Sequence, residues 1–468
     1  MSQKAVLDLA IVGGTVVIPP LGERKLTIGV IGERIGALLD PEQPFDAVGV
    51  IDATDKFVLP GAIDPHVHIG YSGFQGMPIE ALASHFDTES RSALIGGVTS
   101  IVVTYRNPDP YDELFDQMVG AGEENSRVDF AYSLGITNDE HAQRIPEYFD
   151  RLGVTSFKFY MAYRGEEAKT SGNWYNRYDD GLLFEGMERI AKIPGGLVMV
   201  HPENIEIIHR LSARLQAEGR SDLAAWTDSR PAFTEAENVR RALYLAEQTG
   251  CHVYIPHLSS AEALDAVIEH RARRTTPVTV ETCPQYLTHT KDSSCGLLAK
   301  VNPPLRETRD IERLWPALVS GDVQTIGTDH CGVLREMKGP DIWSAVPGFP
   351  GMATMLPVLL NGVGDERIDL ATVAQVTSYN TARAFGLYPR KGTIAVGSDA
   401  DLVIVDLGLT RTITADRLQS RSDFTLYDGQ ALTGWPVVTI VRGAVAAEGE
   451  QVVAKAGFGR YLARGLVQ

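Results

Sequence analysis

His66 and His68 stand at the end of an apolar run, with one residue between them and Asp64 close by. Side chains alternate across a strand, so residues two apart point to the same face. Neutral imidazoles are ligands of transition metals, and this pair could provide half of a metal site. An isolated pair of this kind is about as compatible with two ordinary histidines. The rest of the sequence must therefore decide.

Four other places combine an apolar strand with a residue that can serve a metal site: Lys158, His201, His257 and Asp329. A lysine that extends its amine to solvent from a strand end is the ordinary explanation of Lys158. However, a buried lysine loses its charge readily, and a neutral amine is a nucleophile. By capturing carbon dioxide it becomes a carbamate, which can bridge two cations. With the histidine pair, these residues would supply enough ligands for two metal ions.

The central part of the sequence alternates strand and helix patterns. Helices are predicted at 238–248, 261–271 and 310–319, among others. Eight strands that alternate with helices favour a (β/α)8 barrel, in which catalytic groups lie where strands end. A doubly wound open sheet is the alternative, but no GxGxxG follows the first strand. The predicted strands are 57–63, 99–104, 128–133, 156–160, 197–200, 252–255, 278–282 and 325–327.

Both ends of the chain are rich in short β patterns punctuated by Gly and Asp. We expect them to pair into one small discontinuous β-sandwich, with the barrel between them. Near the start, two short apolar runs predict a hairpin that turns at Gly13–Gly14. The last segment would pack on a neighbouring subunit or fray. The expected domains are 1–56 and 391–454 for the sandwich, 57–390 for the barrel and 455–468 for the tail.

The composition excludes several classes of function. The 468 residues carry a formal net charge of −17, which argues against nucleic acid as a partner. No run of eighteen apolar residues occurs, so no membrane span is expected. The cysteines show no CxxC spacing, which favours a reduced, cytoplasmic setting without structural zinc or disulfides. These cysteines are Cys251, Cys283, Cys295 and Cys331.

The chain resembles the amidohydrolase superfamily and, within it, the dihydropyrimidinase/hydantoinase group, whose close relatives are the allantoinases and dihydroorotases. The similar segments occur in order along almost the whole chain, which makes the resemblance specific. They are residues 61–68, 157–163, 200–204, 256–260, 300–306, 327–331, 347–352, 380–387 and 397–403.

The resemblance implies two divalent metal ions, with zinc as the first candidate and manganese, cobalt and iron as alternatives. Carbon dioxide would be needed to carboxylate the bridging lysine to N6-carboxylysine. One metal would be held by His66, His68 and Asp329, the other by His201 and His257, with carboxylated Lys158 bridging both.

It also implies roles in catalysis. The metal ions would activate a water molecule for attack on the carbonyl of a cyclic amide. Asp329 would carry a proton to the departing ring nitrogen. Tyr163 would donate a hydrogen bond to the substrate carbonyl, and Asn302 would contact the ring amide. His330 and Cys331, beside Asp329, are candidates for orienting a ligand.

The substrate is less well defined by the sequence. Dihydroorotases of this family carry an arginine shortly after the histidine pair, which grips a carboxylate. Residues 69–74 contain no arginine, which disfavours an anionic ring. The asparagine at position 302, however, is more similar to the allantoinases and dihydroorotases than to the hydantoinases. We therefore expect a neutral ring, with hydantoins or dihydropyrimidines ahead of allantoin. Two aromatic loops would pack on the barrel rim or receive a ring substituent: Tyr71, Phe74 and Met77 in one, Trp174, Tyr175 and Tyr178 in the other.

Some proteins that resemble dihydropyrimidinase are non-catalytic scaffolds that have lost metal ligands while keeping the fold. Fold alone does not establish catalysis. Here all six ligand positions and Tyr163 are present, which favours an enzyme. Relatives are commonly tetramers, so the resemblance implies a homotetramer, with a homodimer as the alternative.

Overall fold

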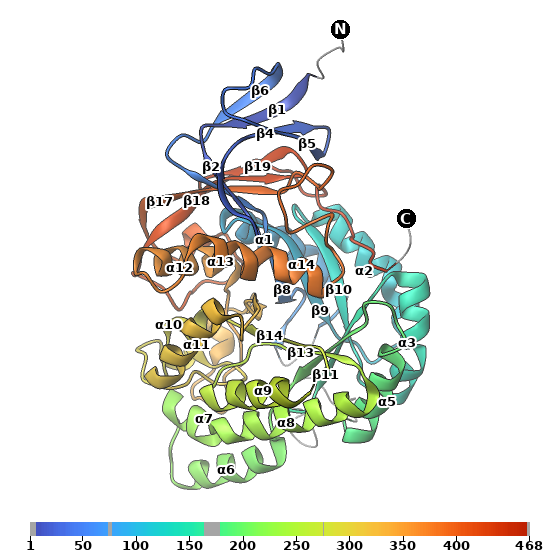
Figure 1. The fold of residues 1–468 in the computed structure, drawn as a ribbon. Helices are drawn as coiled ribbons and strands as arrows, with labels where there is room; N and C mark the ends of the chain where they lie inside the picture. The colour runs from blue at the N-terminus through green and yellow to red at the C-terminus, as the bar shows by residue number, and fades with distance from the viewer. Residues whose placement is uncertain (1–5, 74–76, 163–177, 275, 466–468) are drawn as a thin grey trace.

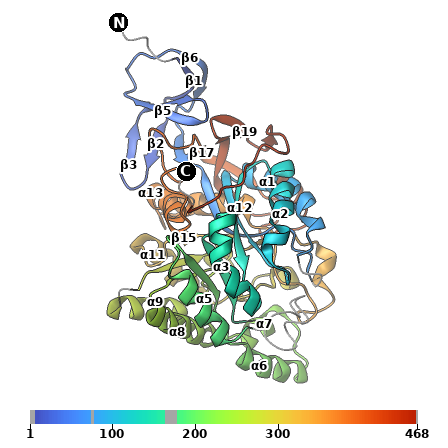
Figure 2. The same cartoon turned by 90° about the vertical axis from the view of Figure 1, so that its right-hand side faces the viewer.

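The computed structural model describes residues 6–73, 77–162, 178–274 and 276–465 (Figure 1). A strand-and-helix barrel forms the larger part. Strands from both ends of the chain form a β-rich part beside it, as the turned view also shows (Figure 2). No helix in the described part of the chain is both long enough and apolar enough to cross a membrane.

The barrel sheet is parallel throughout, in the order β15-β14-β13-β12-β11-β10-β9-β8-β16. The two strands at the ends of this order come from one short segment, which pairs with β14 at its start and with β8 at its end. The sheet therefore closes on itself, and the expected (β/α)8 barrel is confirmed. Its strands are β8 (Ala62–His68), β9 (Val98–Tyr105), β10 (Asp129–Gly135), β11 (Ser156–Tyr160), β12 (Leu197–His201), β13 (His252–Ile255), β14 (Val278–Thr282), β15 (Thr325–Ile326) and β16 (His330–Cys331).

Helices form an outer layer around these strands (Figure 2). Most barrel-strand residues are buried, as expected of parallel strands covered on both faces. Side-chain caps start several helices; the Ser260 hydroxyl, for example, accepts from the Ala263 N–H. The α-helices are α1 (Glu80–Ile95), α2 (Tyr111–Asn125), α3 (Asp139–Leu152), α5 (Asp180–Ile190), α6 (Ile205–Ala217), α7 (Leu223–Ser229), α8 (Ala232–Thr249), α9 (Ala261–Arg273), α10 (Pro284–Thr288), α11 (Thr308–Ser320), α12 (Met352–Gly364), α13 (Leu370–Ala374) and α14 (Asn380–Ala384).

Single helical turns complete this layer. They are the 3₁₀ turns η2 (Gly296–Ala299), η3 (Arg335–Lys338) and η5 (Asp416–Leu418), and the π-helical turn η4 (Gln375–Tyr379). The three predicted helices lie within α8, α9 and α11.

Two sheets make up the β-rich part. A four-stranded sheet has the order β5-β4-β1-β6, and a seven-stranded sheet, drawn from both chain ends, has the order β20-β19-β18-β17-β7-β2-β3. Apolar side chains from both ends form one core, including Ile28, Val30, Leu402 and Ile440. The strands are β1 (Leu7–Val12), β2 (Thr15–Ile18), β3 (Gly22–Lys25), β4 (Thr27–Ile31), β5 (Arg34–Leu39), β6 (Ala47–Asp52), β7 (Phe57–Pro60), β17 (Leu402–Thr412), β18 (Ala431–Val441), β19 (Ala444–Glu448) and β20 (Gln451–Val452).

Two local predictions were wrong. The expected hairpin does not form, because β1 pairs with β4 and β6 while β2 pairs with β3 and β7 in the other sheet. The strand expected at 57–63 is divided at Gly61. Its first half, β7, pairs with β2 and β17, and its second half begins barrel strand β8. A Cβ at Gly61 would collide with the Thr99 side chain, so only glycine fits at this crossing.

The tail packs on the barrel of its own chain, which neither alternative had anticipated. The Phe130 N–H donates to the Arg460 carbonyl at 3.0 Å, and the Leu462 N–H donates to the Phe130 carbonyl at 2.7 Å. The Tyr461 hydroxyl donates to the Leu152 carbonyl at 2.8 Å. The described tail, up to Gly465, is thus held like an added strand beside β10.

A buried charge cluster joins the barrel to the β-rich part. The Lys391 ammonium lies 2.6 Å from Asp129, which opens β10, and 2.6 Å from Asp401, which precedes β17. Asp399 lies 3.1 Å away, and the Arg442 guanidinium also pairs with Asp129. Lys391 and Arg442 are therefore buried among three buried carboxylates, and Asp399 also pairs with the partly exposed Arg390 guanidinium at 2.9 Å.

Candidate functional site

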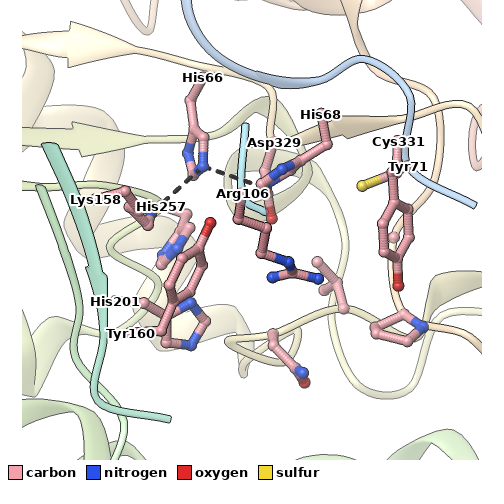
Figure 3. Close-up of a pocket in the computed structure, with 14 residues that line it drawn as sticks. His66, His68, Tyr71, Arg106, Lys158, Tyr160, His201, His257, Asp329 and Cys331 are labelled. Carbon is pink, nitrogen blue, oxygen red and sulfur yellow. Dashed lines mark hydrogen bonds and ion pairs between the residues drawn. The ribbon is translucent and has the colours of Figure 1, made fainter. Parts of the chain in front are cut away.

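The six expected metal ligands line one pocket at the carboxyl ends of the barrel strands (Figure 3). The pocket, together with the open space at its mouth, measures about 450 Å³. His66 and His68 end β8, Lys158 lies in β11, and His201 ends β12. His257 follows β13, and Asp329 lies between β15 and β16, so residues far apart in sequence are brought together by the barrel.

His66, His68 and Asp329 form the tightest group. One oxygen of Asp329 lies 3.0 Å from Nε2 of His68 and 3.5 Å from Nε2 of His66. One ligand atom from each residue lies within 4.8 Å of the others, a spacing that could hold a metal ion. These three residues are the ligands expected for one of the two metal ions.

The other half lies beside it. The rings of His201 and His257 have their centroids 4.5 Å apart, and the His257 ring lies 5.2 Å from the His66 ring. The Lys158 Nζ lies 3.4 Å from Nε2 of His66. The amine therefore contacts the first group of histidines and also acts electrostatically on His257 in the second, as a carbamate shared by both groups would require.

Buried carboxylates orient these imidazoles from behind. Glu281 Oε1 lies 3.2 Å from Nδ1 of His66 and accepts the His257 N–H at 2.8 Å. Glu203 Oε2 lies 2.8 Å from Nε2 of His201. Such partners set the ring orientation and leave the other ring nitrogen for a ligand. Because Glu281 lies against Nδ1 of His66, Nε2 of the same ring is left facing Lys158 and Asp329.

The electrostatics match a metal donor set. Burial, together with the nearby Lys158, holds the pKa values of His66 and His257 well below the usual range, so both imidazoles are neutral. Burial also lowers the pKa of Lys158 to about 8. Burial alone would raise the pKa of Asp329, but the adjacent His66 and His68 hold it at about 2. Neutral imidazoles, an ionised carboxylate and a readily deprotonated amine are the forms that metal binding and carbamate formation require.

Two of these positions have an unusual backbone. His257 has φ 41° and Asp329 has φ 52°, in the left-handed region that residues with a side chain rarely adopt. Such conformations cost free energy and persist where the surroundings enforce them, often at functional sites. Nδ1 of His257 is buried without a hydrogen-bond partner among the described residues. An unsatisfied ligand-type nitrogen of this kind is consistent with a site built for a metal.

Asn302 also lines the pocket. Its Oδ1 is buried and has no partner among the described atoms, so it can accept a hydrogen bond from a ligand. Asp64 lies below the histidine pair, where it accepts hydrogen bonds from the N–H groups of His66 and Thr328. Cys331 lines the pocket, whereas His330 turns to Glu89 at 2.8 Å.

Some expected residues cannot be placed. Tyr163, Phe74, Trp174 and Tyr175 lie outside the described residues. Of the other loop aromatics and apolar residues, Tyr71 lines the pocket, while Met77 and Tyr178 are buried in the core.

Sequence reasoning missed three kinds of residue. Arg106, directly after β9, lines the pocket and has its guanidinium 5.3 Å from the ring centroid of Tyr160, a second lining residue that was not predicted. The signal was available, because Arg106 follows the predicted strand at 99–104 at the end where catalytic groups gather. Glu203 and Glu281, the carboxylates behind the histidines, were the third kind.

Comparison with known proteins agrees with this geometry. The amidohydrolase family profile matches residues 204–446. The chain is 36% identical over 444 residues to an L-hydantoinase of Paenarthrobacter aurescens, which covers 92% of this chain and 93% of that protein. It is 34% identical over 449 residues to an allantoinase of Deinococcus radiodurans, with 93% and 94% covered.

Solved structures give the same result. The structure of an L-hydantoinase (dihydropyrimidinase) from Arthrobacter aurescens has a TM-score of 0.90 and 33% identity, covering 98% of this chain and 100% of that one. A dihydropyrimidinase from Brevibacillus agri has a TM-score of 0.89 and 31% identity, with 97% and 98% covered. The chain therefore belongs to the amidohydrolase family, in the group that contains the hydantoinases, dihydropyrimidinases and allantoinases.

Proposed function

We propose that the protein is a binuclear metal hydrolase that opens a hydantoin or dihydropyrimidine ring to the N-carbamoyl amino acid. Membership of its group makes the chain a cyclic amidohydrolase. The observation that carries the finer proposal is the convergence of His66, His68, Lys158, His201, His257 and Asp329 on one pocket.

The proposed ligand sets follow this arrangement. His66, His68 and Asp329 would hold one ion, and His201 and His257 would hold the other, with carboxylated Lys158 as the ligand shared by both. Imidazole and carboxylate donors suit Zn²⁺ best among the candidates, with Mn²⁺, Co²⁺ and Fe²⁺ as alternatives. When bound, the metal ions supply a nucleophilic water at neutral pH and polarise the substrate carbonyl.

The protein's own residues then place and protonate the substrate. Tyr163 donates a hydrogen bond to the oxygen of the ring carbonyl, where negative charge develops during attack. Asn302 Oδ1 accepts from the ring amide N–H, which supplies the partner that this buried oxygen lacks. As the ring C–N bond breaks, the Asp329 carboxylate passes the proton taken from the attacking water to the departing nitrogen. No second base is needed.

An allantoinase is the second candidate, because one allantoinase relative is 34% identical over nearly the whole chain. The asparagine at position 302, which is similar to the allantoinases, also favours this second candidate. A non-catalytic scaffold is disfavoured, since the six ligand positions are all present. We also propose a homotetramer, with a homodimer as the alternative. A cytoplasmic location is supported by four free cysteines.

A substrate panel tests the proposal. Zinc-reconstituted protein is given 5-phenylhydantoin, dihydrouracil and allantoin, and ring opening is followed by absorbance and by product mass. Turnover of a hydantoin or of dihydrouracil above that of allantoin is expected. A strong preference for allantoin would replace the first candidate with the second. Loss of activity with chelator and its recovery with zinc should accompany any turnover.

A further inference from the structure

The residue after Asp329 has its side chain held at both ring nitrogens. His330 is fully buried, and its Nδ1 accepts hydrogen bonds from the N–H groups of Gly351 and Met352 at 3.0 and 3.4 Å. Its Nε2 lies 2.8 Å from Oε2 of Glu89. Because Nδ1 accepts, the ring proton is on Nε2 and is donated to the carboxylate. The ring is therefore fixed from both sides.

Glu89 lies in α1, and its carboxylate is buried among hydrogen-bond donors. The Ser420 hydroxyl donates to Oε2 at 2.6 Å. The Arg421 N–H and the Thr88 hydroxyl donate to Oε1 at 3.0 and 2.7 Å. An ionised carboxylate only accepts, so donors on both oxygens suit the charged form. Charge-assisted hydrogen bonds of this kind compensate the burial and set the orientation of the group.

Two of these donors come from the β-rich part of the chain. Ser420 and Arg421 lie in the connection between β17 and β18 of the seven-stranded sheet. The Arg421 guanidinium also donates to the carbonyl of Gly332, which follows β16. A Cβ at Gly332 would lie 3.0 Å from the Arg421 side chain and 3.2 Å from Oε1 of Glu89. The connection and the end of β16 are thus in close contact at Glu89.

The backbone around Asp329 needs support of this kind. Its φ of 52° lies in the left-handed region, which persists only where the surroundings enforce it. The Thr328 N–H donates to Asp64 at 3.1 Å, and the His330 N–H donates to the Thr328 hydroxyl at 3.2 Å. Since His330 is the next residue along the chain, a shift of its ring and backbone would move the Asp329 carboxylate relative to His68.

We propose that Glu89 is a positioning residue for Asp329, which acts through His330 and joins the proton-carrying carboxylate to the connection between β17 and β18. The proposal rests on the proposed function, because it takes Asp329 as metal ligand and proton carrier. It gives the β-rich part a share in catalysis, although the described lining of the pocket comes from the barrel.

Glu89→Gln tests this role, since the amide replaces one accepting oxygen with a donor. At saturating zinc, kcat for the fastest substrate of the panel should fall roughly 10- to 100-fold, the effect of a small misplacement of a reacting group. KM should stay near the wild-type value. The solvent deuterium isotope effect on kcat should rise, because proton transfer by a displaced Asp329 becomes the slow step. Loss of folded enzyme alone would lower kcat without changing this isotope effect.

Zinc affinity gives a readout without turnover. Because Asp329 is a proposed ligand, Glu89→Gln should weaken zinc binding by roughly 10-fold, measured by competition with a chromogenic chelator.

Ser420→Ala tests the link to the β-rich part by removing one donor to Glu89. It should lower kcat by roughly 5-fold, the effect of one hydrogen bond, and raise the isotope effect. Ser422→Ala is the matched control, because the Ser422 hydroxyl is buried two residues away and has no hydrogen-bond partner among the described atoms. It should behave like the wild type. Should Glu89→Gln fail to fold, this pair of serine variants still decides the matter.

The outcomes separate the two proposals. Wild-type kcat and zinc affinity in Glu89→Gln would overturn the positioning role and leave the proposed function standing. A fall in kcat with an unchanged isotope effect would also overturn it, because the residue would then serve only the fold. Equal kcat in Ser420→Ala and Ser422→Ala would overturn the link to the β-rich part. If zinc-loaded wild type opens none of hydantoin, dihydrouracil and allantoin, the proposed function itself fails, and zinc affinity still tests whether Glu89 positions Asp329.

Discussion

Glu281 Oε1 lies 3.2 Å from Nδ1 of His66, and both side chains are buried. The same oxygen accepts the His257 N–H at 2.8 Å. One carboxylate thus fixes the ring of a residue in the first proposed ligand set and the backbone of a residue in the second. The Tyr254 hydroxyl holds the other oxygen, Oε2, at 2.7 Å, so the carboxylate cannot turn. The two halves of the centre are therefore positioned from one point.

Glu281→Gln should weaken zinc binding by roughly 10- to 100-fold, the usual effect of losing a partner that orients a ligand. The amide keeps the size of the side chain but replaces one accepting oxygen of the carboxyl group with an NH₂ donor. Zinc affinity is measured by competition with a chromogenic chelator. Glu262→Gln on the exposed face of α9 is the control and should bind zinc like the wild type. Unchanged affinity in Glu281→Gln would show that the carboxylate does not support the site.

Tyr163→Phe should lower kcat by roughly 100-fold or more, because a donor aimed at the developing oxyanion is lost. Zinc content should stay at the wild-type level, since the hydroxyl is not a proposed ligand. Steady-state kinetics and metal analysis of one preparation give both results. Tyr244→Phe, which removes a hydroxyl from an exposed tyrosine on α8, should be neutral. A Tyr163→Phe enzyme with wild-type kcat would remove this residue from the mechanism.

Lys391→Met should destabilise the fold by about 3–5 kcal/mol, the cost of leaving buried charges without their partner. Burial alone would lower the pKa of Lys391, but Asp401, Asp129 and Asp399 hold it above the usual value. Without the Lys391 ammonium, Arg442 is the buried cation that still pairs with this group of carboxylates, through Asp129. Denaturant unfolding measures the change. Arg390→Met, which breaks a partly exposed pair with Asp399, should cost about 1 kcal/mol or less. Equal effects of the two variants would contradict the role given to the cluster.

The buried amine of Lys338 should make the free energy of unfolding depend on pH. Burial lowers its pKa to about 7 in the folded protein, against about 10.4 in an unfolded chain. Between these values the unfolded chain binds the extra proton, so folding becomes more favourable as the pH rises and gains nothing below pH 7. The slope is at most about 1.4 kcal/mol per pH unit for one proton.

Lys338→Met removes this titration. The stability of wild type relative to the variant should therefore rise between pH 7 and pH 9, measured by denaturant unfolding of both at each pH. The Lys338 amine also donates to the carbonyls of Val346 and Gly348, so the variant loses some stability at every pH. Only the change with pH reports the titration. Parallel pH profiles would show that Lys338 titrates normally.

The sequence was sufficient to predict the barrel and the place of the expected ligands. Each ligand lies at the end of an apolar strand, and the strand ends of a barrel converge, so local patterns predict a shared site. Glu281 lies inside a predicted strand, where nothing local shows that its side chain meets His66. Arg106 was at the right end of a strand, but arginine is not a metal ligand and was not sought.

The errors in the β-rich part have a different cause. The runs that form β1 and β2 alternate in a way that suits a hairpin or two separate sheets equally well. Their partners, β6 and β7, lie far along the chain, and pairing over such distances leaves no local signal. The break at Gly61 depends on close contact with Thr99, which also requires the folded structure.

Metal stoichiometry of the Lys158 variant tests the central claim most directly. Apo-protein is loaded with zinc in bicarbonate buffer, and bound metal per chain is measured by mass spectrometry of the metal. Lys192→Met, at an exposed lysine, is the control. We expect two zinc ions per chain in wild type and control, and about one, with no turnover, in Lys158→Met. Two zinc ions and full turnover in Lys158→Met would contradict a carboxylated Lys158 at the centre of the site.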